Sequence, residues 1–284
     1  MATFSNRATL TYTGGTALSN VVTGEITEVL TITKTAAGDT YRAGDTLTYV
    51  VTLINSGTTP LTGVTLTDDL GAYPFGTGTL TPLTYVADSL LYYADGVLGA
   101  TPTITSLSPL TLTGITVPAG GDATIVYRAA LNEFAPTAAG ATVENTVSAS
   151  GGGLTAPITA TETVTVVDEA ALSITKSLSP TTVPENGEIT YTLLVENYGN
   201  TAATATDNVS ITDTFDPILS DITVTLDGDT LVAGTDYTYD ETTGVFTTTA
   251  GRITLPSATV TQDPVTGVYT TTPGTATLTV TGTI

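Results

Sequence analysis

The chain has 284 residues, with 27 acidic and six basic side chains and a formal net charge of −21. Nucleic acid is not an expected partner, because phosphate binding needs clustered Lys and Arg. The chain contains no Cys, His or Trp, which excludes disulfides, the usual zinc ligand sets and histidine-based catalysis. No acidic pair has a recognisable catalytic setting, so we expect no enzyme activity, no cofactor and no metal centre.

The predicted fold class is all-β. Leu47, Tyr49, Val51 and Leu53 alternate with other residues along one segment, the period of a strand. Thr is abundant and Gly and Pro recur at short intervals, which favours a sandwich of two sheets. No apolar run is long enough to cross a bilayer, so no membrane insertion is expected. No signal peptide is visible after Met1, and release by lysis of the producing cell is one alternative route.

Residues 1–29 are predicted as an N-terminal donor strand followed by a connector. Ala8, Leu10 and Tyr12 fall on one face of this strand, with polar residues between them, and such a strand can add to the exposed edge of another sheet. The alternative is a disordered tail, which is the default for the end of a domain.

Residues 30–157 and 171–284 are predicted as two copies of one domain, separated by a connector at 158–170. Four pairs of residues share an offset of 142 positions without a gap, a strong repeat signal: Lys34 and Lys176, Tyr49 and Tyr191, Asn55 and Asn197, Gly57 and Gly199. The tyrosines lie on the predicted core face, and the asparagines precede glycines as turn-capping residues do.

The second copy is predicted to lack its last strand. The first copy continues through 143–153, and the second has no such segment after its strand at 276–281. Residues 5–15 resemble the missing piece, with Asn6 in the position of Asn145. A sandwich short of one strand exposes unpaired backbone groups. We therefore expect an acceptor edge at Ala276, Leu278 and Val280, filled by the N-terminal strand of another subunit to give a head-to-tail homopolymer.

Two runs of residues carry a family resemblance: 44–49 with Asn55-Ser-Gly57, and 187–191 with Asn197-Tyr-Gly199. They resemble the DUF11 repeat family of prokaryotic surface proteins. The resemblance implies Ig-like or prealbumin-like β-sandwich modules in tandem on the cell exterior, with structural or adhesive roles. The two-module length is also similar to that of subunits of spore appendages, which implies an extracellular place on a cell or spore surface. No surface receptor is indicated.

Both lysines of the repeat are candidates for covalent chemistry. A buried lysine has a lowered pKa, and its neutral amine can attack an asparagine carboxamide with help from a carboxyl group. In the first copy this set would be Lys34, Asn145 and Asp68. The second set would be Lys176, Asp213 and Asn6 of another subunit, with Asn20 as a less well aligned substitute for Asn6. The alternative for each lysine is a salt bridge to Asp68 or Asp213.

The leading functional hypothesis is a self-assembling subunit of an extracellular filament, a spore appendage or a pilus-like fibre. The alternative is a monomeric adhesive or ligand-binding surface module. Asp227, Asp229 and Asp236 lie close together in the sequence but lack the full ligand spacing of a calcium loop.

Overall fold

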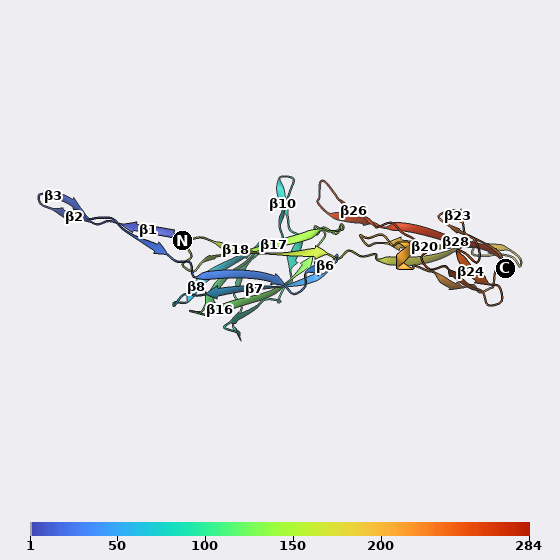
Figure 1. Ribbon diagram of the computed structural model, residues 1–284, viewed down its shortest axis with the longest axis horizontal. Helices are drawn as coiled ribbons and strands as arrows, with labels where there is room; N and C mark the ends of the chain where they lie inside the picture. The colour runs from blue at the N-terminus through green and yellow to red at the C-terminus, as the bar shows by residue number, and fades with distance from the viewer. Residues whose placement is uncertain (1) are drawn as a thin grey trace. The chain divides into compact units, whose positions relative to one another are not determined.

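The computed structural model describes residues 2–284, and Met1 lies outside the described residues. The fold is all-β, as predicted (Figure 1). Among the described residues the one helical element is the 3₁₀ turn η1 (Ala205–Asp207). The chain divides into two compact units, one made of 1–135 with 142–165 and the other of 136–141 with 166–284. We call the sandwiches in these units the first and the second sandwich.

One sheet of the first sandwich has the strand order β13-β12-β16-β7-β5, with β11 also pairing β16. These strands are β5 (Leu30–Ala36), β7 (Thr46–Asn55), β11 (Leu83–Tyr85), β12 (Leu91–Ala94), β13 (Val97–Leu98) and β16 (Asp122–Leu131). The predicted core residues of β7, Tyr49 and Leu53 among them, are fully buried. Strand alternation therefore places one face of this sheet in the core.

The facing sheet has the order β14-β15-β8-β17-β18-β6. Its strands are β6 (Thr40–Tyr41), β8 (Leu61–Asp68), β14 (Thr103–Leu107), β15 (Leu110–Val117), β17 (Thr142–Gly151) and β18 (Ile158–Val166). A short hairpin of β9 (Tyr73–Phe75) and β10 (Gly78–Leu80) belongs to the same unit. The segment 158–170, expected as a connector, is therefore largely a strand of the first sandwich. Val164 of β18 is buried, so its apolar surface fixes that strand against the core.

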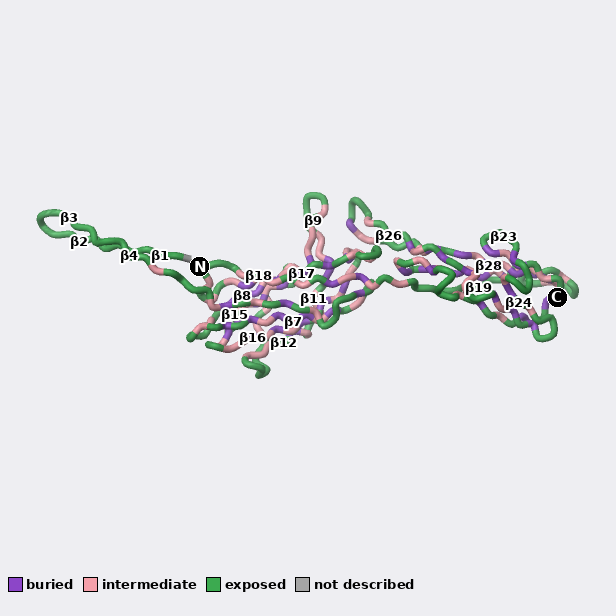
Figure 2. The backbone as a smooth tube through the Cα atoms, viewed as in Figure 1, coloured by how far each residue is buried: buried purple, intermediate pink, exposed green. Residues whose placement is uncertain are grey.

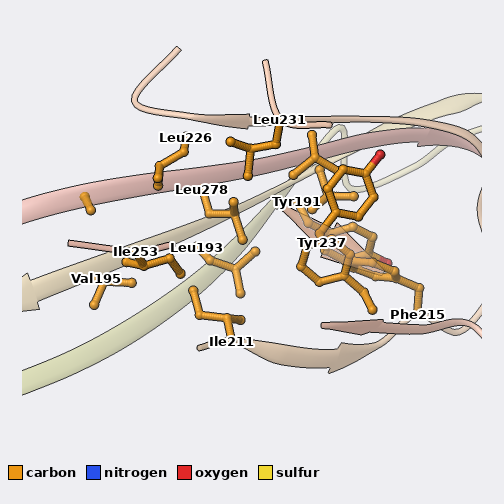
Figure 3. Packing of buried hydrophobic residues seen from close by; sticks show 14 of the residues in the cluster. Tyr191, Leu193, Val195, Ile211, Phe215, Leu226, Leu231, Tyr237, Ile253 and Leu278 are labelled. Carbon is orange, nitrogen blue, oxygen red and sulfur yellow. The ribbon is translucent and has the colours of Figure 1, made fainter. Parts of the chain in front are cut away.

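The second sandwich repeats this plan. Its larger sheet has the order β19-β20-β28-β22-β23, which matches β5-β7-β16-β12-β13, and its smaller sheet has the order β21-β25-β24, which matches β8-β15-β14. The strands are β19 (Leu172–Ser179), β20 (Glu188–Asn197), β21 (Thr212–Thr214), β22 (Ser220–Leu226), β23 (Asp229–Thr230), β24 (Tyr237–Asp240), β25 (Val245–Thr248) and β28 (Gly274–Thr283). A hairpin of β26 (Thr259–Gln262) and β27 (Tyr269–Thr272) projects before β28. Aromatic and aliphatic side chains from both sheets form the core, among them Tyr191, Phe215 and Leu278 (Figure 3).

Within residues 2–284 the second sandwich has no counterpart of β17 or β18. The predicted acceptor edge was wrong. Ala276, Leu278 and Val280 lie on β28, which pairs with β20 on one side and β22 on the other, and all three are buried. In the first sandwich the chain leaves β16 and crosses to the other sheet, where β17 pairs with β8. The strand that follows β16 in the sequence therefore pairs in the facing sheet and not with β16. By the same arrangement, the free edge of the second sandwich belongs to β21, the counterpart of β8.

The N-terminal segment forms strands, but it pairs with itself. β1 (Ala2–Asn6) pairs with β4 (Val22–Ile26), and β2 (Thr9–Tyr12) pairs with β3 (Gly15–Leu18) (Figure 1). We call residues 2–26 the N-terminal ribbon. The expected connector thus contains the second arm of a hairpin, because the glycines at 14 and 15 allow a tight reversal of the chain.

Candidate functional site

Lys34 lies on the inner face of β5 with its side chain fully buried. Its Nζ is 2.6 Å from Asp68 Oδ2 and 4.9 Å from the centre of the Tyr49 ring. Burial lowers the pKa of the Lys34 ammonium, and the neighbouring Asp68 carboxylate opposes that shift. A buried amine needs such a partner, because an unpaired charge in the core is very costly.

Asp68, the last residue of β8, is the centre of this cluster. Its Oδ2 accepts hydrogen bonds from Lys34 Nζ and from the Tyr127 hydroxyl, each at 2.6 Å. Its Oδ1 accepts the backbone N–H of Leu70 at 3.0 Å. Burial also raises the pKa of Tyr127, so the phenol stays protonated and donates.

Asn145 reaches the same cluster from β17 and is fully buried. Its Nδ2 donates to the Tyr127 hydroxyl at 3.4 Å, and its Oδ1 has no hydrogen-bond partner. The rings of Tyr49 and Tyr127 stack beside it with their centres 5.5 Å apart. A buried carboxamide with an unsatisfied oxygen is costly and calls for an explanation.

The structure thus brings together Lys34, Asp68 and Asn145, the three residues predicted for the first set. Tyr127 was missed by the sequence analysis. The alternation of β16, which buries Ala123 and Ile125 on the same face, is the signal that would have found it. An amine, a carboxyl group and a carboxamide in one buried cluster are the groups that isopeptide-bond formation requires, in which the amine replaces ammonia on the carboxamide.

The second sandwich contains counterparts of Lys34, Asp68 and Tyr49. Lys176 forms an ion pair with Asp213, and its Nζ lies 4.5 Å from the centre of the Tyr191 ring. Val280 of β28 takes the place of Tyr127, since the two residues are opposite Tyr191 and Tyr49 in matched strand pairs. No hydrogen bond among the described residues joins an asparagine to this pair. Asn6 lies at the end of β1, exposed, in the other unit.

The two lysines also differ in exposure. The Lys34 side chain is 0% exposed and the Lys176 side chain 39%. The difference extends along the strand, because Leu30 of β5 is 4% exposed while its counterpart Leu172 of β19 is 41% exposed. Figure 2 shows β19 as exposed.

We call this surface the uncovered face of the second sandwich. It consists of the inward-facing side chains of β19 and the free edge of β21: Leu172, Ile174, Lys176, Leu178 and Thr212–Thr214. In the first sandwich β17 contacts β5 and pairs with β8. The uncovered face is therefore the place that β17 and β18 occupy in the first sandwich.

The predicted turn asparagines are confirmed. Asn55 Oδ1 accepts the N–H of Gly57 at 2.9 Å, and Asn197 Oδ1 accepts the N–H of Gly199 at 3.0 Å. Each amide also donates to backbone carbonyls, Asn197 to Pro256 at 3.0 Å. Both asparagines are fully buried, so they fasten a turn to the sandwich. The two repeat tyrosines, Tyr49 and Tyr191, are core residues as expected.

The acids considered for calcium have other partners. Asp227 Oδ1 accepts the N–H of Thr277 at 2.7 Å, and Asp236 Oδ1 lies 2.8 Å from Arg252 Nε. Within the described range 2–284, no group of three or more acidic side chains is arranged to hold a metal ion. No helix in that same range has the length and apolar character needed to span a bilayer.

No protein-family model matches the sequence, and no curated protein matches it. Similar solved structures include BcpA, the major pilin subunit of Bacillus cereus, with 10% identity, 96% of this chain and 73% of that chain covered, and a TM-score of 0.36. The RrgB pilus backbone of Streptococcus pneumoniae has 12% identity, coverage of 86% and 55%, and a TM-score of 0.34. A C-terminal fragment of the major pilin GBS80 of Streptococcus agalactiae has 12% identity, coverage of 87% and 91%, and a TM-score of 0.33.

Proposed function

We propose that this chain is the structural subunit of an extracellular filament, a spore appendage or a pilus-like fibre on a cell or spore surface. In this proposal the N-terminal segment of one subunit completes the second sandwich of the next. The observation that carries it is the difference between the two sandwiches. β17 and β18 cover the site around Lys34, and the matching surface around Lys176 is uncovered.

Such a surface favours association. The free edge of β21 presents backbone groups that can pair with another strand. Ile174, 51% exposed, adds apolar area, and covering its exposed half gains about half of the 1.5–3 kcal/mol that burial of a fully exposed Ile side chain gives. A donor from a second copy makes a heterologous contact, and repetition of a contact that does not close gives a filament.

The repeated Tyr, Asn and Gly positions support placing the two sandwiches in the DUF11 class of surface modules. Their buried turn asparagines, Asn55 and Asn197, make equivalent hydrogen bonds to Gly57 and Gly199. This assignment remains part of the proposal.

We further propose that isopeptide bonds lock both sandwiches. In the first, Lys34 Nζ attacks Asn145 Cγ, a new C–N bond forms, and the Asn145 nitrogen leaves as ammonia, with protons passing through Asp68. In the second, Lys176 reacts in the same way with Asn6 of the neighbouring subunit, assisted by Asp213. The burial of Lys34 beside Asp68 and the unsatisfied Asn145 Oδ1 support the first bond.

Deletion of residues 1–25 tests the assembly. The shortened chain should remain a soluble monomer while the full chain forms filaments in electron micrographs. Val265→Asp, at a tip that is 85% exposed in the β26–β27 hairpin, is the control and should assemble normally. Filaments from the shortened chain would refute donation, and a full chain that stays monomeric would favour the adhesive module.

Intact-mass measurement tests the bond in the first sandwich. The denatured monomer should be lighter than its sequence mass by one ammonia, and Lys34→Met should restore the full mass. A wild-type monomer at full sequence mass would rule out the Lys34–Asn145 bond.

Boiling filaments in detergent tests the bond between subunits. Wild-type filaments should give a ladder of covalent multimers, and Asn6→Ala filaments should dissolve to monomers. Asn20→Ala, a change at the other asparagine of residues 1–29, should keep the ladder. Complete dissolution of wild-type filaments would eliminate the intermolecular bond and leave strand donation standing.

A further inference from the structure

The part of the N-terminal ribbon that β1 and β4 form has one apolar and one polar face. Directly opposite residues of an antiparallel pair point to the same side of the sheet. The residue pairs of β1 and β4 therefore fall alternately on its two faces. Phe4 opposite Gly24 and Asn6 opposite Val22 share a face with Ile26, whereas Thr3 opposite Glu25 and Ser5 opposite Thr23 share the other. The Phe4 ring lies over Gly24, where no side chain intervenes.

The apolar face of the ribbon is uncovered. Phe4 is 54% exposed, Val22 56% and Ile26 39%, and Figure 2 shows the ribbon as exposed along nearly all its length. A lone two-stranded hairpin is at best marginally stable in water. An amphipathic ribbon therefore gains stability when a second apolar surface covers this face.

The ribbon has the same plan as the β17–β18 hairpin. Each reverses at glycines, and each leads into the first strand of a sandwich, β5 or β19. Asn6 of the ribbon stands opposite Val22, as Asn145 of β17 stands opposite Glu162 of β18. Two residues before each asparagine, Phe4 of the ribbon matches Val143 of β17. Four residues after each facing residue, Ile26 matches Val166 of β18.

The outer strand of that hairpin belongs to the core. Val164 of β18, opposite the buried Val143 of β17, is 0% exposed. A single donated strand would replace β17 alone and leave the place of β18 empty. The uncovered face of the second sandwich is thus two strands wide.

We propose that the donor is the whole two-stranded ribbon of a second copy of this chain. The segment from Ala8 into β2 pairs with β21 and the residues just before it, β3 and β4 form the outer strand in the place of β18, and Asn6 lies beside Lys176 and Asp213. This inference rests on the proposed function and specifies its joint.

The comparison also fixes the register. Val147 of β17 is opposite Asp68 and Ser148 is opposite Thr67. The matching pairs at the joint are Ala8 opposite Asp213 and Thr9 opposite Thr212. Both threonines are exposed, so they can be exchanged without loss of core packing.

A disulfide tests this register, since the chain has no Cys of its own. Residues opposite each other in an antiparallel pair lie within disulfide range. In an Asn6→Ala background, Thr9→Cys with Thr212→Cys should give a ladder of multimers under oxidising conditions that reduction removes. Thr9→Cys with Thr214→Cys, shifted by two residues, is the matched control and should not. Equal ladders from both pairs, or none from the first pair in assembled filaments, would refute the register.

A disulfide between the two arms of the ribbon tests whether both arms bind to the neighbouring subunit together. Ser5 and Thr23 are opposite each other on the polar face, so Ser5→Cys with Thr23→Cys should close a disulfide within one subunit. The oxidised chain should form filaments as fast as the reduced chain. Assembly of the reduced chain alone would show that the arms must separate, and the ribbon model would be wrong.

A charge on the second arm tests whether that arm is buried. Ile26→Asp, on the apolar face, should raise the concentration needed for assembly at least about tenfold, the factor that corresponds to about 1.4 kcal/mol. Thr23→Asp adds the same charge to the polar face and should assemble as the wild type does. Equal assembly of both variants, with normal wild-type filaments, would overturn the ribbon and leave the filament proposal intact. Absence of wild-type filaments would instead refute the proposed function.

Discussion

At the scale of single residues, the two lysines of the repeat show how one position acquires two environments. Lys34 and Lys176 occupy the same place in matched strands, and each pairs with the aspartate of the facing sheet. Lys34 is closed off by β17, whereas Lys176 is partly open to solvent. Desolvation is therefore the difference between them, and desolvation is what favours a neutral amine.

The lowered pKa of Lys34 predicts a pH dependence in a variant that cannot form the proposed bond. In Asn145→Ala, the folded state should hold fewer protons than the unfolded state between the lowered pKa of Lys34 and the ordinary lysine value of about 10.4. Stability contributed by Lys34 should therefore rise with pH across this window. The measurement is the unfolding free energy of Asn145→Ala minus that of Asn145→Ala with Lys34→Met, followed from neutral to alkaline pH. A difference that stays constant with pH would show that Lys34 keeps its ordinary pKa.

At the scale of elements, the contrast between β5 and β19 carries the functional argument. Both strands have apolar residues at alternate positions. β5 pairs with β7, and β19 pairs with the matching strand β20. Leu30 is buried and Leu172 is not. Within residues 2–284, equivalent sequences thus give a covered core in one sandwich and an open surface in the other, because among these residues only the first sandwich has β17 and β18 beside it.

A charge on the uncovered face should separate assembly from folding. Ile174 is already half exposed, so Ile174→Asp should change the thermal stability of the monomer little while it blocks filament formation. Thr175→Asp, on the opposite side of β19, is the matched control and should assemble. The measurements are calorimetry of the monomer and light scattering during assembly. Filament growth in Ile174→Asp at the wild-type rate would show that β19 is not part of the joint.

Sequence periodicity predicted the strands of β7 and β20 and the core tyrosines Tyr49 and Tyr191, because alternate burial leaves a local signature. It did not predict the order of strands in space. The acceptor edge was placed on Val280 and its neighbours in β28, although that strand is paired on both sides. Nor did it predict which strands β18 and the second arm of the ribbon pair with, since pairing partners leave no signature in local alternation.

At the scale of the whole molecule, charge is the dominant long-range property. The formal net charge of −21 makes copies of the chain repel one another. The proposed joint must overcome this repulsion through the apolar ribbon face and the strand edge. Few basic residues are available to offset it, since the chain has only six.

Filament growth should therefore accelerate with ionic strength. The Debye length falls from about 30 Å at 0.01 M to about 10 Å at 0.1 M salt, so repulsion between subunits weakens over this range. Light scattering at a series of sodium chloride concentrations measures the effect. A growth rate that does not change with salt concentration would contradict this prediction.

The sequence by itself determined the all-β class, the two copies of one module, the matched lysine and aspartate pairs and the turn asparagines. Each of these is recorded in local alternation or in a fixed offset along the chain. Only the tertiary structure decided that Tyr127 joins Lys34, Asp68 and Asn145, that the free edge lies on β21, and that the N-terminal segment is a ribbon whose β1–β4 part has one apolar face. These features depend on which strands lie side by side across the two sheets, and strand order in space is set by packing between segments far apart in the sequence.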